Sequence, residues 1–143
     1  MKIVQSIGLA VITAFILISC LEGSINAQEN AATLLGKWNI VADSTFIGVG
    51  SNNHAVNYSG HSGDYFDCRV DGNIYIKEGA ILDTLSYNLI SDTTIIIESF
   101  GINLNGTPET SHITNLSLHA ATVNAPLVIT PGGEFGRVIH LSR

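Results

Sequence analysis

The sequence predicts an all-β domain, and specifically a small eight-stranded up-and-down antiparallel barrel. Apolar and polar residues alternate with a period of two from Leu34 to the end of the chain, whereas helical spacing is absent. Tight turn residues separate most of the alternating segments, which favours strands that pair with their chain neighbours. Closing such a sheet into a barrel removes its exposed edges. A β-sandwich with the same number of strands is the alternative.

Each strand is placed by its alternation and by the turn residues that bound it. Trp38, Ile40 and Ala42 should share one face of the first strand, and Asp71-Gly72 should form a two-residue type I′ turn. Before the second strand, residues 48–64 form a loop too long for a hairpin turn. The expected strands are Trp38–Ile47, Tyr65–Val70, Asn73–Lys77, Thr84–Ile90, Thr93–Phe100, Thr110–Leu116, one within Leu118–Ile129, and Phe135–Leu141.

Length and charge limit the classes of function. The chain has 143 residues, of which 45% are hydrophobic and 13% are charged, which is typical of one compact domain rather than of a disordered chain. Its formal net charge of −6 argues against nucleic-acid binding, which needs a basic patch to displace counterions from phosphates. The same charge disfavours electrostatic adhesion to anionic lipid.

The first residues are typical of an export signal. Lys2 precedes an uncharged, mostly apolar run over residues 7–18, which is shorter than the roughly 20 residues that span a bilayer. The sequence Leu17-Ile18-Ser19-Cys20 resembles a bacterial lipobox, in which the cysteine becomes lipidated. We therefore expect a signal peptide at 1–19 and a membrane anchor at Cys20. Ordinary cleavage near Ala27, which would release a soluble periplasmic or secreted protein, is the alternative.

The remaining chain divides into a tether and a folded part. Residues 20–33 have no β pattern and read as a flexible tether, and residues 34–143 carry all the expected strands. Acylation of Cys20 would leave Cys68 as a free thiol. Cys68 shares the parity of Phe66 and Val70, so we expect it to face the core as a small apolar residue.

A family resemblance follows from the order of several short motifs. Leu34-Leu35-Gly36-Lys37-Trp38-Asn39-Ile40 resembles the first strand of lipocalins, in which Gly-x-Trp opens the barrel. The later pattern of Tyr65-Phe66, Asp71-Gly72, Asp83-Thr84, Tyr87 and the terminal Ile139–Arg143 is similar to small lipocalin-like lipoproteins of Bacteroidetes. The resemblance implies that Trp38 plugs the closed end of the barrel. It also implies that a basic residue packs over this indole, with Arg143 the best match and Arg137 the second.

Polar residues near the implied open end are the candidates for ligand binding. The loop at 48–64 contains His54, Tyr58, His61 and Asp64, which could orient a ligand. Arg137 shares the parity of Phe135 and Ile139, so a regular last strand would direct it inward. A buried guanidinium needs a partner, which could be the carboxylate of a ligand or an internal acid. A bulge at Gly136 would instead leave Arg137 in solvent.

Metal binding and catalysis find little support in the sequence. The five histidines lack a recognised zinc spacing, and residues 67–78 fit a calcium loop except for Arg69, a cation where an oxygen ligand is required. Nucleophile elbows, phosphate loops and dinucleotide fingerprints are absent. We therefore expect no enzyme activity, no metal and no cofactor.

Two functions remain. The first is an exported, lipid-anchored lipocalin-like protein that binds a small apolar or amphipathic ligand, or a carboxylate, at the outer membrane. The second is a structural or interaction lipoprotein of the cell envelope, with a side-chain-filled barrel and a protein partner. A crowded inward face without a pocket above about 300 Å³ would favour the second.

Overall fold

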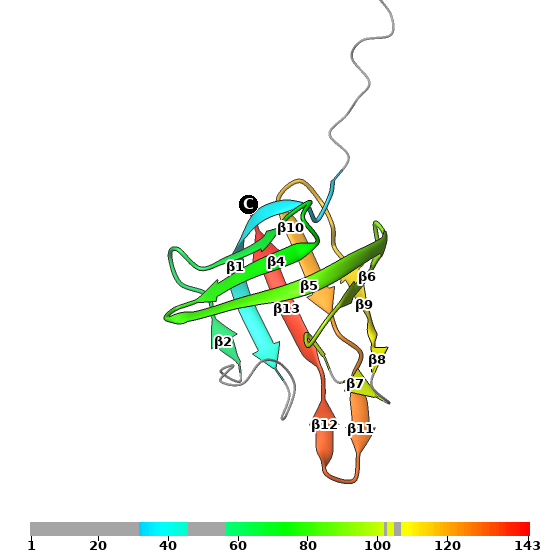
Figure 1. The fold of residues 1–143 in the computed structure, drawn as a ribbon. Helices are drawn as coiled ribbons and strands as arrows, with labels where there is room; N and C mark the ends of the chain where they lie inside the picture. Colours follow the sequence, from blue (N-terminus) through cyan, green and yellow to red (C-terminus); the bar gives the residue numbers. More distant parts are fainter. Residues whose placement is uncertain (1–31, 46–56, 102, 105–106) are drawn as a thin grey trace, which may run out of the picture. The chain divides into compact units, whose positions relative to one another are not determined.

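The computed structural model describes residues 32–45, 57–101, 103–104 and 107–143. The chain separates into two units, Met1–Ala31 and Ala32–Arg143. The first unit, with the expected signal peptide and Cys20, lies outside the described residues, and so does His54. Every core residue among those described belongs to the second unit, which is described below (Figure 1).

All the regular structure of the described residues is β-strand, which confirms the all-β prediction. None of these residues belongs to a helix long and apolar enough to cross a bilayer. The strands are β1 (Gly36–Thr45), β2 (Tyr58–Ser59), β3 (Tyr65–Cys68), β4 (Asn73–Glu78), β5 (Ile81–Ser91), β6 (Thr94–Ile97), β7 (Asn103–Leu104), β8 (Thr107–Pro108), β9 (Thr110–Thr114), β10 (Ala120–Asn124), β11 (Val128–Thr130), β12 (Gly133–Phe135) and β13 (Arg137–Ser142).

Eight of these strands form one antiparallel sheet that returns to its starting strand. Hydrogen bonding follows the order β1-β3-β4-β5-β6-β9-β10-β13, and β13 pairs with β1 over Asn39–Thr45 and Arg137–Ser142. Apart from short strands that lie outside the ring, neighbours in space are neighbours in the chain. The up-and-down order and the ring-like closure are therefore present in one continuous sheet.

On the edge that does not pair with β13, β1 pairs with two strands, β3 and β2. Gly36–Asn39 of β1 pairs with β3, and Ala42 and Asp43 pair with β2. Gly60 connects β2 to the turn before β3, and its amide donates to the carbonyl of Val41 at 2.9 Å. A Cβ at Gly60 would lie 1.8 Å from the carbonyl oxygen of Ile40, so only glycine allows this approach.

A bulge in β1 changes which residues face inward. The register between β1 and β13 shifts between Ile40 and Ala42. Trp38 and Ile40 are buried before the shift, and Asp43 and Thr45 are buried after it. The prediction that Ala42 shares the face of Trp38 and Ile40 is therefore wrong, because the extra residue of a bulge moves later side chains to the opposite face.

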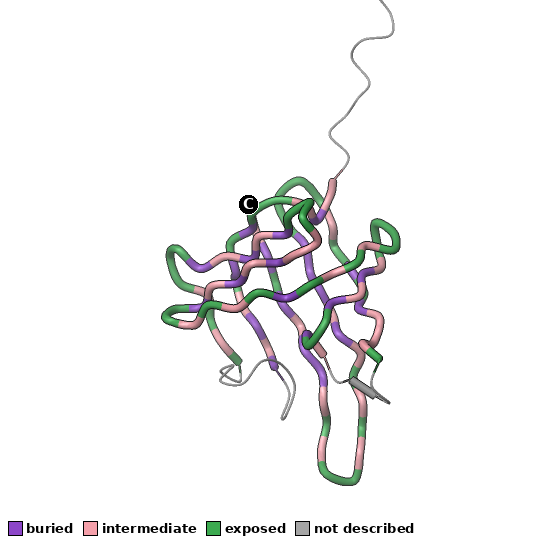
Figure 2. Tube along the Cα trace, viewed as in Figure 1, coloured by how far each residue is buried: buried purple, intermediate pink, exposed green. Residues whose placement is uncertain are grey.

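The inward side chains form a single apolar cluster. Strands β3, β4, β6 and β13 alternate strictly between buried and more exposed residues (Figure 2). Because successive side chains of a strand point to opposite faces, every second side chain lies in the interior. The cluster contains Leu34, Trp38, Ile40, Phe66, Cys68, Ile74, Ile76, Leu85, Ile95, Ile97, Phe100, Ile113, Ala121, Val123, Ala125, Ile139 and Leu141.

Several boundaries differ from the sequence prediction. The predicted loop at 48–64 contains β2, and Pro131-Gly132 is the tip of a further hairpin, β11–β12. Glu78, just beyond the predicted strand Asn73–Lys77, belongs to β4 and is buried. Asp71-Gly72 ends a longer turn, in which the Gly72 amide donates to Arg69 at 3.2 Å and only Gly72 has a positive φ. This geometry fits a type I turn followed by a left-handed glycine, so the type I′ prediction is wrong.

Candidate functional site

A buried ion pair lies inside the ring, at the end of β1 that leads away from Ala32. Nε and Nη2 of Arg137 donate to Oδ2 of Asp43 at 2.9 and 2.6 Å. The side chains of Arg137 and Asp43 are 1% and 0% exposed. Arg137 begins β13 and pairs with Thr45, the last residue of β1, so the ends of two adjacent strands position the pair.

The surroundings of the pair match its charges. The hydroxyl of Thr45 donates to Oδ1 of Asp43 at 3.2 Å, so both oxygens of this carboxylate accept hydrogen bonds. The guanidinium carbon of Arg137 lies 4.5 Å from the centre of the Phe100 ring, a distance typical of a cation–π contact. Arg137 is therefore held by a carboxylate on one side and an aromatic ring on another.

Two alternatives for Arg137 are resolved by this geometry. Arg137 is buried on the same face of β13 as Ile139 and Leu141, so a bulge at Gly136 does not place it in solvent. Its described partner is an internal acid, Asp43. The sequence analysis overlooked Asp43 because strict alternation along β1 would direct it outward, and the bulge after Ile40 reverses this direction.

A second polar cluster joins the segment around β2 to the turn between β4 and β5. Oδ2 of Asp64 accepts hydrogen bonds from the hydroxyl of Tyr58 at 2.6 Å and from the amide of His61 at 2.7 Å. Oδ1 of Asp64 accepts from the amide of Gly79 at 2.8 Å. Asp64 is 3% exposed. Three donors from two segments of the chain thus converge on one buried carboxylate.

These contacts shift the pKa of both ionisable partners. Burial alone would raise the pKa of Asp64, but the hydrogen bonds from Tyr58, Gly79 and His61 lower it below its ordinary value. The hydrogen bond to this carboxylate raises the pKa of Tyr58 to about 12. At neutral pH Asp64 is therefore an anion and Tyr58 a neutral hydrogen-bond donor. Neither group is poised to exchange a proton, so the contact is typical of one that stabilises the fold.

The structure brings together three of the four polar residues that were proposed to orient a ligand. Tyr58, His61 and Asp64 contact one another, and the Tyr58 hydroxyl lies 3.1 Å from Nδ1 of His61. The His61 side chain is 73% exposed. Sequence reasoning missed the link from Asp64 to Gly79, since nothing in a linear sequence pairs a loop with a turn 15 residues later.

Trp38 and Arg143 contact each other at the opposite end of the ring. Trp38 is fully buried, and its indole nitrogen donates to the carbonyl of Leu34 at 2.8 Å. The guanidinium carbon of Arg143 lies 3.7 Å from the centre of the indole ring. Arg143 also donates to the carbonyl of Leu35. The contact that the resemblance implied between Trp38 and Arg143 is thus present.

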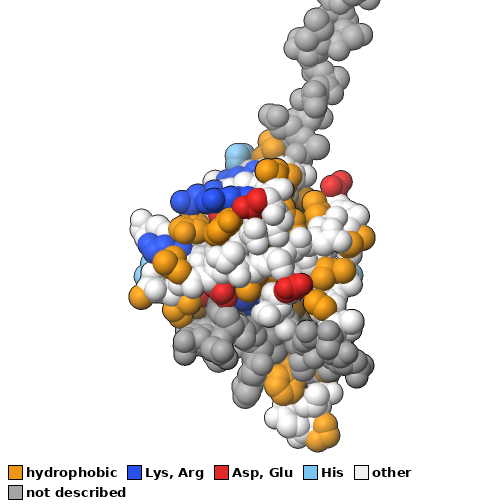
Figure 3. Space-filling view, viewed as in Figure 1, with side chains coloured by type: hydrophobic (Ala, Val, Ile, Leu, Met, Phe, Trp, Pro, Cys, Tyr) orange, Lys and Arg blue, Asp and Glu red, His pale blue; other side chains and the backbone are white. Residues whose placement is uncertain are grey.

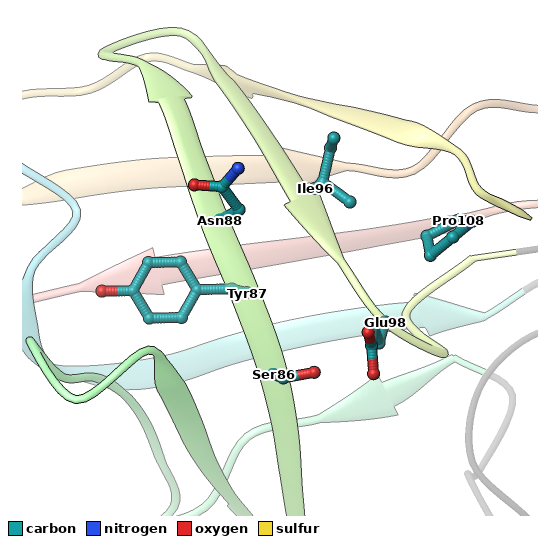
Figure 4. Close-up of a pocket in the computed structure, with 6 residues that line it drawn as sticks. All are labelled: Ser86, Tyr87, Asn88, Ile96, Glu98 and Pro108. Atoms are coloured by element: carbon teal, nitrogen blue, oxygen red, sulfur yellow. The ribbon is translucent and has the colours of Figure 1, made fainter.

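A pocket of about 170 Å³ lies on the outer surface rather than in the core. Ser86 and Asn88 belong to the outward face of β5, and Glu98 follows β6 (Figure 4). Pro108 of β8 borders the pocket on another side. This volume is below the roughly 300 Å³ at which pockets for small molecules usually begin.

The free thiol is part of the core. Cys68 is 1% exposed on the inward face of β3, and burial raises its pKa to about 11. The thiol is thus protonated at neutral pH, whereas nucleophilic cysteines need the thiolate. Within the part of the chain that the structure describes, no three His, Cys, Asp or Glu side chains are grouped as metal ligands would be.

Comparison of the chain with known protein families, with curated proteins and with solved structures finds no match.

Proposed function

We propose that this protein is an exported, lipid-anchored interaction protein of the cell envelope, built on a lipocalin-like barrel filled with its own side chains. In this proposal Cys20 carries the lipid, residues 20–33 form the tether and the ring of residues 34–143 contacts other envelope components. It is the second of the two functions drawn from the sequence.

The observation that carries the proposal is the neutralisation of Arg137 by Asp43. A ligand-binding interior would use its buried cation to attract a carboxylate, but here an acid of the protein occupies the Nε and Nη2 donors. The inward face is crowded with Trp, Phe, Ile and Leu side chains, and the pocket on the described surface is small and lies outside. These features favour packing over binding, by the criterion set out from the sequence.

The lipid anchor can be tested by metabolic labelling with a fatty acid. Bacteria expressing the full chain are supplied with labelled palmitate, and the label on the purified protein is measured. We expect labelling of the wild type and of Cys68→Ala, and none of Cys20→Ala. The Cys68 variant is the matched control, since it removes the other cysteine of the chain. A wild-type chain that is cleaved near Ala27 and carries no label would contradict the anchor.

The filled interior can be tested by native mass spectrometry after mild purification. We expect the mass of the polypeptide with its acyl groups and nothing more. A small molecule that is retained by the wild type and lost in Arg137→Met would instead support the ligand-binding function, with Tyr58 and His61 as the next residues to test.

A further inference from the structure

The exposed cations of the described unit lie on one side of the ring. Of its Lys and Arg residues, Arg137 is buried and the other four reach the surface. Lys37 belongs to the outward face of β1, Arg69 follows β3, and Lys77 belongs to the outward face of β4. Arg143 lies over Trp38, beside the start of β1. We call these four residues the cationic face.

Register and contacts bring the strand residues of this face together. Lys37 lies opposite Asp67, which lies opposite Tyr75, and Tyr65 lies opposite Lys77. The Lys37 ammonium is 4.3 Å from the centre of the Tyr65 ring. The Arg69 guanidinium is 4.2 Å from that of Tyr75. Cations thus alternate with tyrosine rings across three neighbouring strands.

Two acids belong to the same surface and reduce its charge. Nε of Arg69 donates to Asp67 at 2.7 Å. Asp71 accepts hydrogen bonds from Asn73 and Tyr75 in the turn after β3. Lys37 and Lys77 have no acid within ion-pair distance among the described residues, so no described ion pair offsets their charge.

The opposite side of the ring is acidic. Asp92 lies in the turn between β5 and β6, Glu98 follows β6 and Glu109 precedes β9, and no described Lys or Arg accompanies them. In the closed order of strands, β6 and β9 lie opposite β1 and β3. In the view of Figure 3, blue side chains gather toward β3 and β4 with a red one beside them, whereas the Asp and Glu side chains visible toward β6 have no blue neighbour. The unit therefore has a strong charge asymmetry despite its negative total.

The chain enters the unit beside the cationic face. Ala32 is five residues before Lys37, and Arg143 donates to the carbonyl of Leu35 just before β1. The preceding residues include the apolar run at 7–18 and Cys20. In the proposed setting a lipid on Cys20 would lie 12 residues before Ala32 in the sequence, and a coil of about that length spans about 20 Å.

We infer that the cationic face docks on the anionic surface of a lipid bilayer and orients the ring on the membrane. This inference rests on the proposed lipid anchor. The anchor would keep the protein close to the bilayer, and the resulting high local concentration would allow a weak surface contact to form. Basic residues attract anionic headgroups within a Debye length, and one lipid signal together with a basic surface gives a more stable attachment than either alone. The acidic side would then face away from the membrane, where repulsion from the headgroups is least.

The test uses residues 32–143, the unit that contains every described core residue, so that neither the apolar run at 7–18 nor an acyl chain on Cys20 contributes to binding. Binding is measured by cosedimentation with vesicles of phosphatidylcholine alone or mixed with phosphatidylglycerol. We expect binding to the mixed vesicles only, and its loss when salt rises from about 0.1 M to about 1 M, where the Debye length falls to about 3 Å.

The double variant Lys37→Gln with Lys77→Gln should bind the mixed vesicles about 25-fold more weakly than the wild type, because each lost cation weakens binding about fivefold. The matched control is Asn88→Asp with His112→Asp, which lowers the net charge equally at exposed positions of β5 and β9 and should leave binding unchanged. The emission of Trp38 verifies that each variant is folded.

Three outcomes would overturn the inference. These are absence of binding to the mixed vesicles, equal losses in the two pairs of variants, and binding to a soluble anionic polysaccharide without binding to vesicles. None of them bears on the palmitate labelling of Cys20, so failure of the docking surface and failure of the anchor remain distinguishable.

Discussion

Arg137 and Asp43 place a full positive and a full negative charge in the interior of the ring. Removing two charges from water is unfavourable, and their attraction offsets this only with good geometry and further hydrogen bonds. Here the two donors of Arg137, the hydroxyl of Thr45 and the ring of Phe100 supply these contacts. The free energy of unfolding should therefore fall strongly when one partner of the pair is replaced, and much less when both partners are replaced.

Replacing Arg137 with Met should reduce the free energy of unfolding by about 3–5 kcal/mol, because Asp43 is left as a buried charge without its described cation. The double variant Arg137→Met with Asp43→Leu should recover a large part of this loss. Urea denaturation of both singles and the double forms the thermodynamic cycle. Arg69→Met, at an exposed cation, is the control and should change stability by about 0.5 kcal/mol or less. Equal effects at Arg69 and Arg137 would contradict the importance of the pair.

Asp64 should make stability depend on acid pH. Its pKa is lower in the folded protein than the ordinary value of about 3.9, so its contribution is complete above that value and is lost as pH falls through the folded pKa. Asp64→Asn should reduce the free energy of unfolding by about 2–3 kcal/mol near neutral pH, because a buried acceptor of three hydrogen bonds is changed. The difference from wild type should shrink as the pH falls below about 4.

Denaturation curves at several pH values measure this difference. Asp92→Asn, at an exposed turn, is the control and should follow the wild-type pH profile. A gap between wild type and Asp64→Asn that stays constant down to the lowest pH would show that Asp64 does not act as an anion.

At the scale of elements, the strand β1 determines much of the ring. It pairs with β13 on one edge and with β3 and β2 on the other, and its bulge directs Asp43 toward Arg137. Gly60 allows the segment after β2 to lie directly against β1. The approach of two backbones, rather than side-chain packing, sets the geometry at this place.

Gly60→Ala should therefore be destabilising by about 1–3 kcal/mol or more, since the new methyl would collide with the carbonyl of Ile40 and force the backbone to move. Thermal unfolding measures the effect. Gly132→Ala, at the tip of the β11–β12 hairpin, is the matched control, because its Cβ would meet the Thr130 hydroxyl at an ordinary 3.6 Å. Similar melting temperatures for the two variants would show that β2 is free to separate from β1.

Strand positions were predicted well where alternation and turn residues coincide, as in β3, β4 and β9. The short strands β2, β11 and β12 were missed, because two or three residues are too few to show a period. The start of β5 was placed three residues late, since Asp83 on the inward parity interrupts the expected apolar pattern. At the candidate site, Arg137 could be identified from parity, whereas Asp43 could not, because a bulge leaves no signal in composition.

At the scale of the whole unit, one cluster of buried side chains connects all eight strands of the ring. Trp38 is the largest member of this cluster and the only indole of the chain. Its ring is covered by Arg143 from the last strand, and its nitrogen donates to Leu34 before the first. Because Trp38 contacts residues from both ends of the folded unit, its fluorescence should change when the ring opens between the first and the last strand.

Trp38→Ala should lower the free energy of unfolding by about 3–5 kcal/mol, because it empties the volume of the largest core side chain. In the wild type, emission from Trp38 should be blue-shifted and should change at the same urea concentration as the far-ultraviolet circular dichroism, since the ring has a single core. A fluorescence transition that precedes the loss of strand signal would show that the Trp38 end opens independently.

The amino-acid sequence by itself determined the all-β class, the number and order of the ring strands, the inward direction of Trp38 and the burial of Cys68. These properties depend on local alternation and turn chemistry, which act between residues close in the chain. Only the tertiary structure decided the partner of Arg137, the convergence of Tyr58, His61 and Gly79 on Asp64, and the gathering of the exposed cations on one side. These depend on register, on one bulge and on closure of the sheet, which join residues as far apart as Asp43 and Arg137 and which no local pattern encodes.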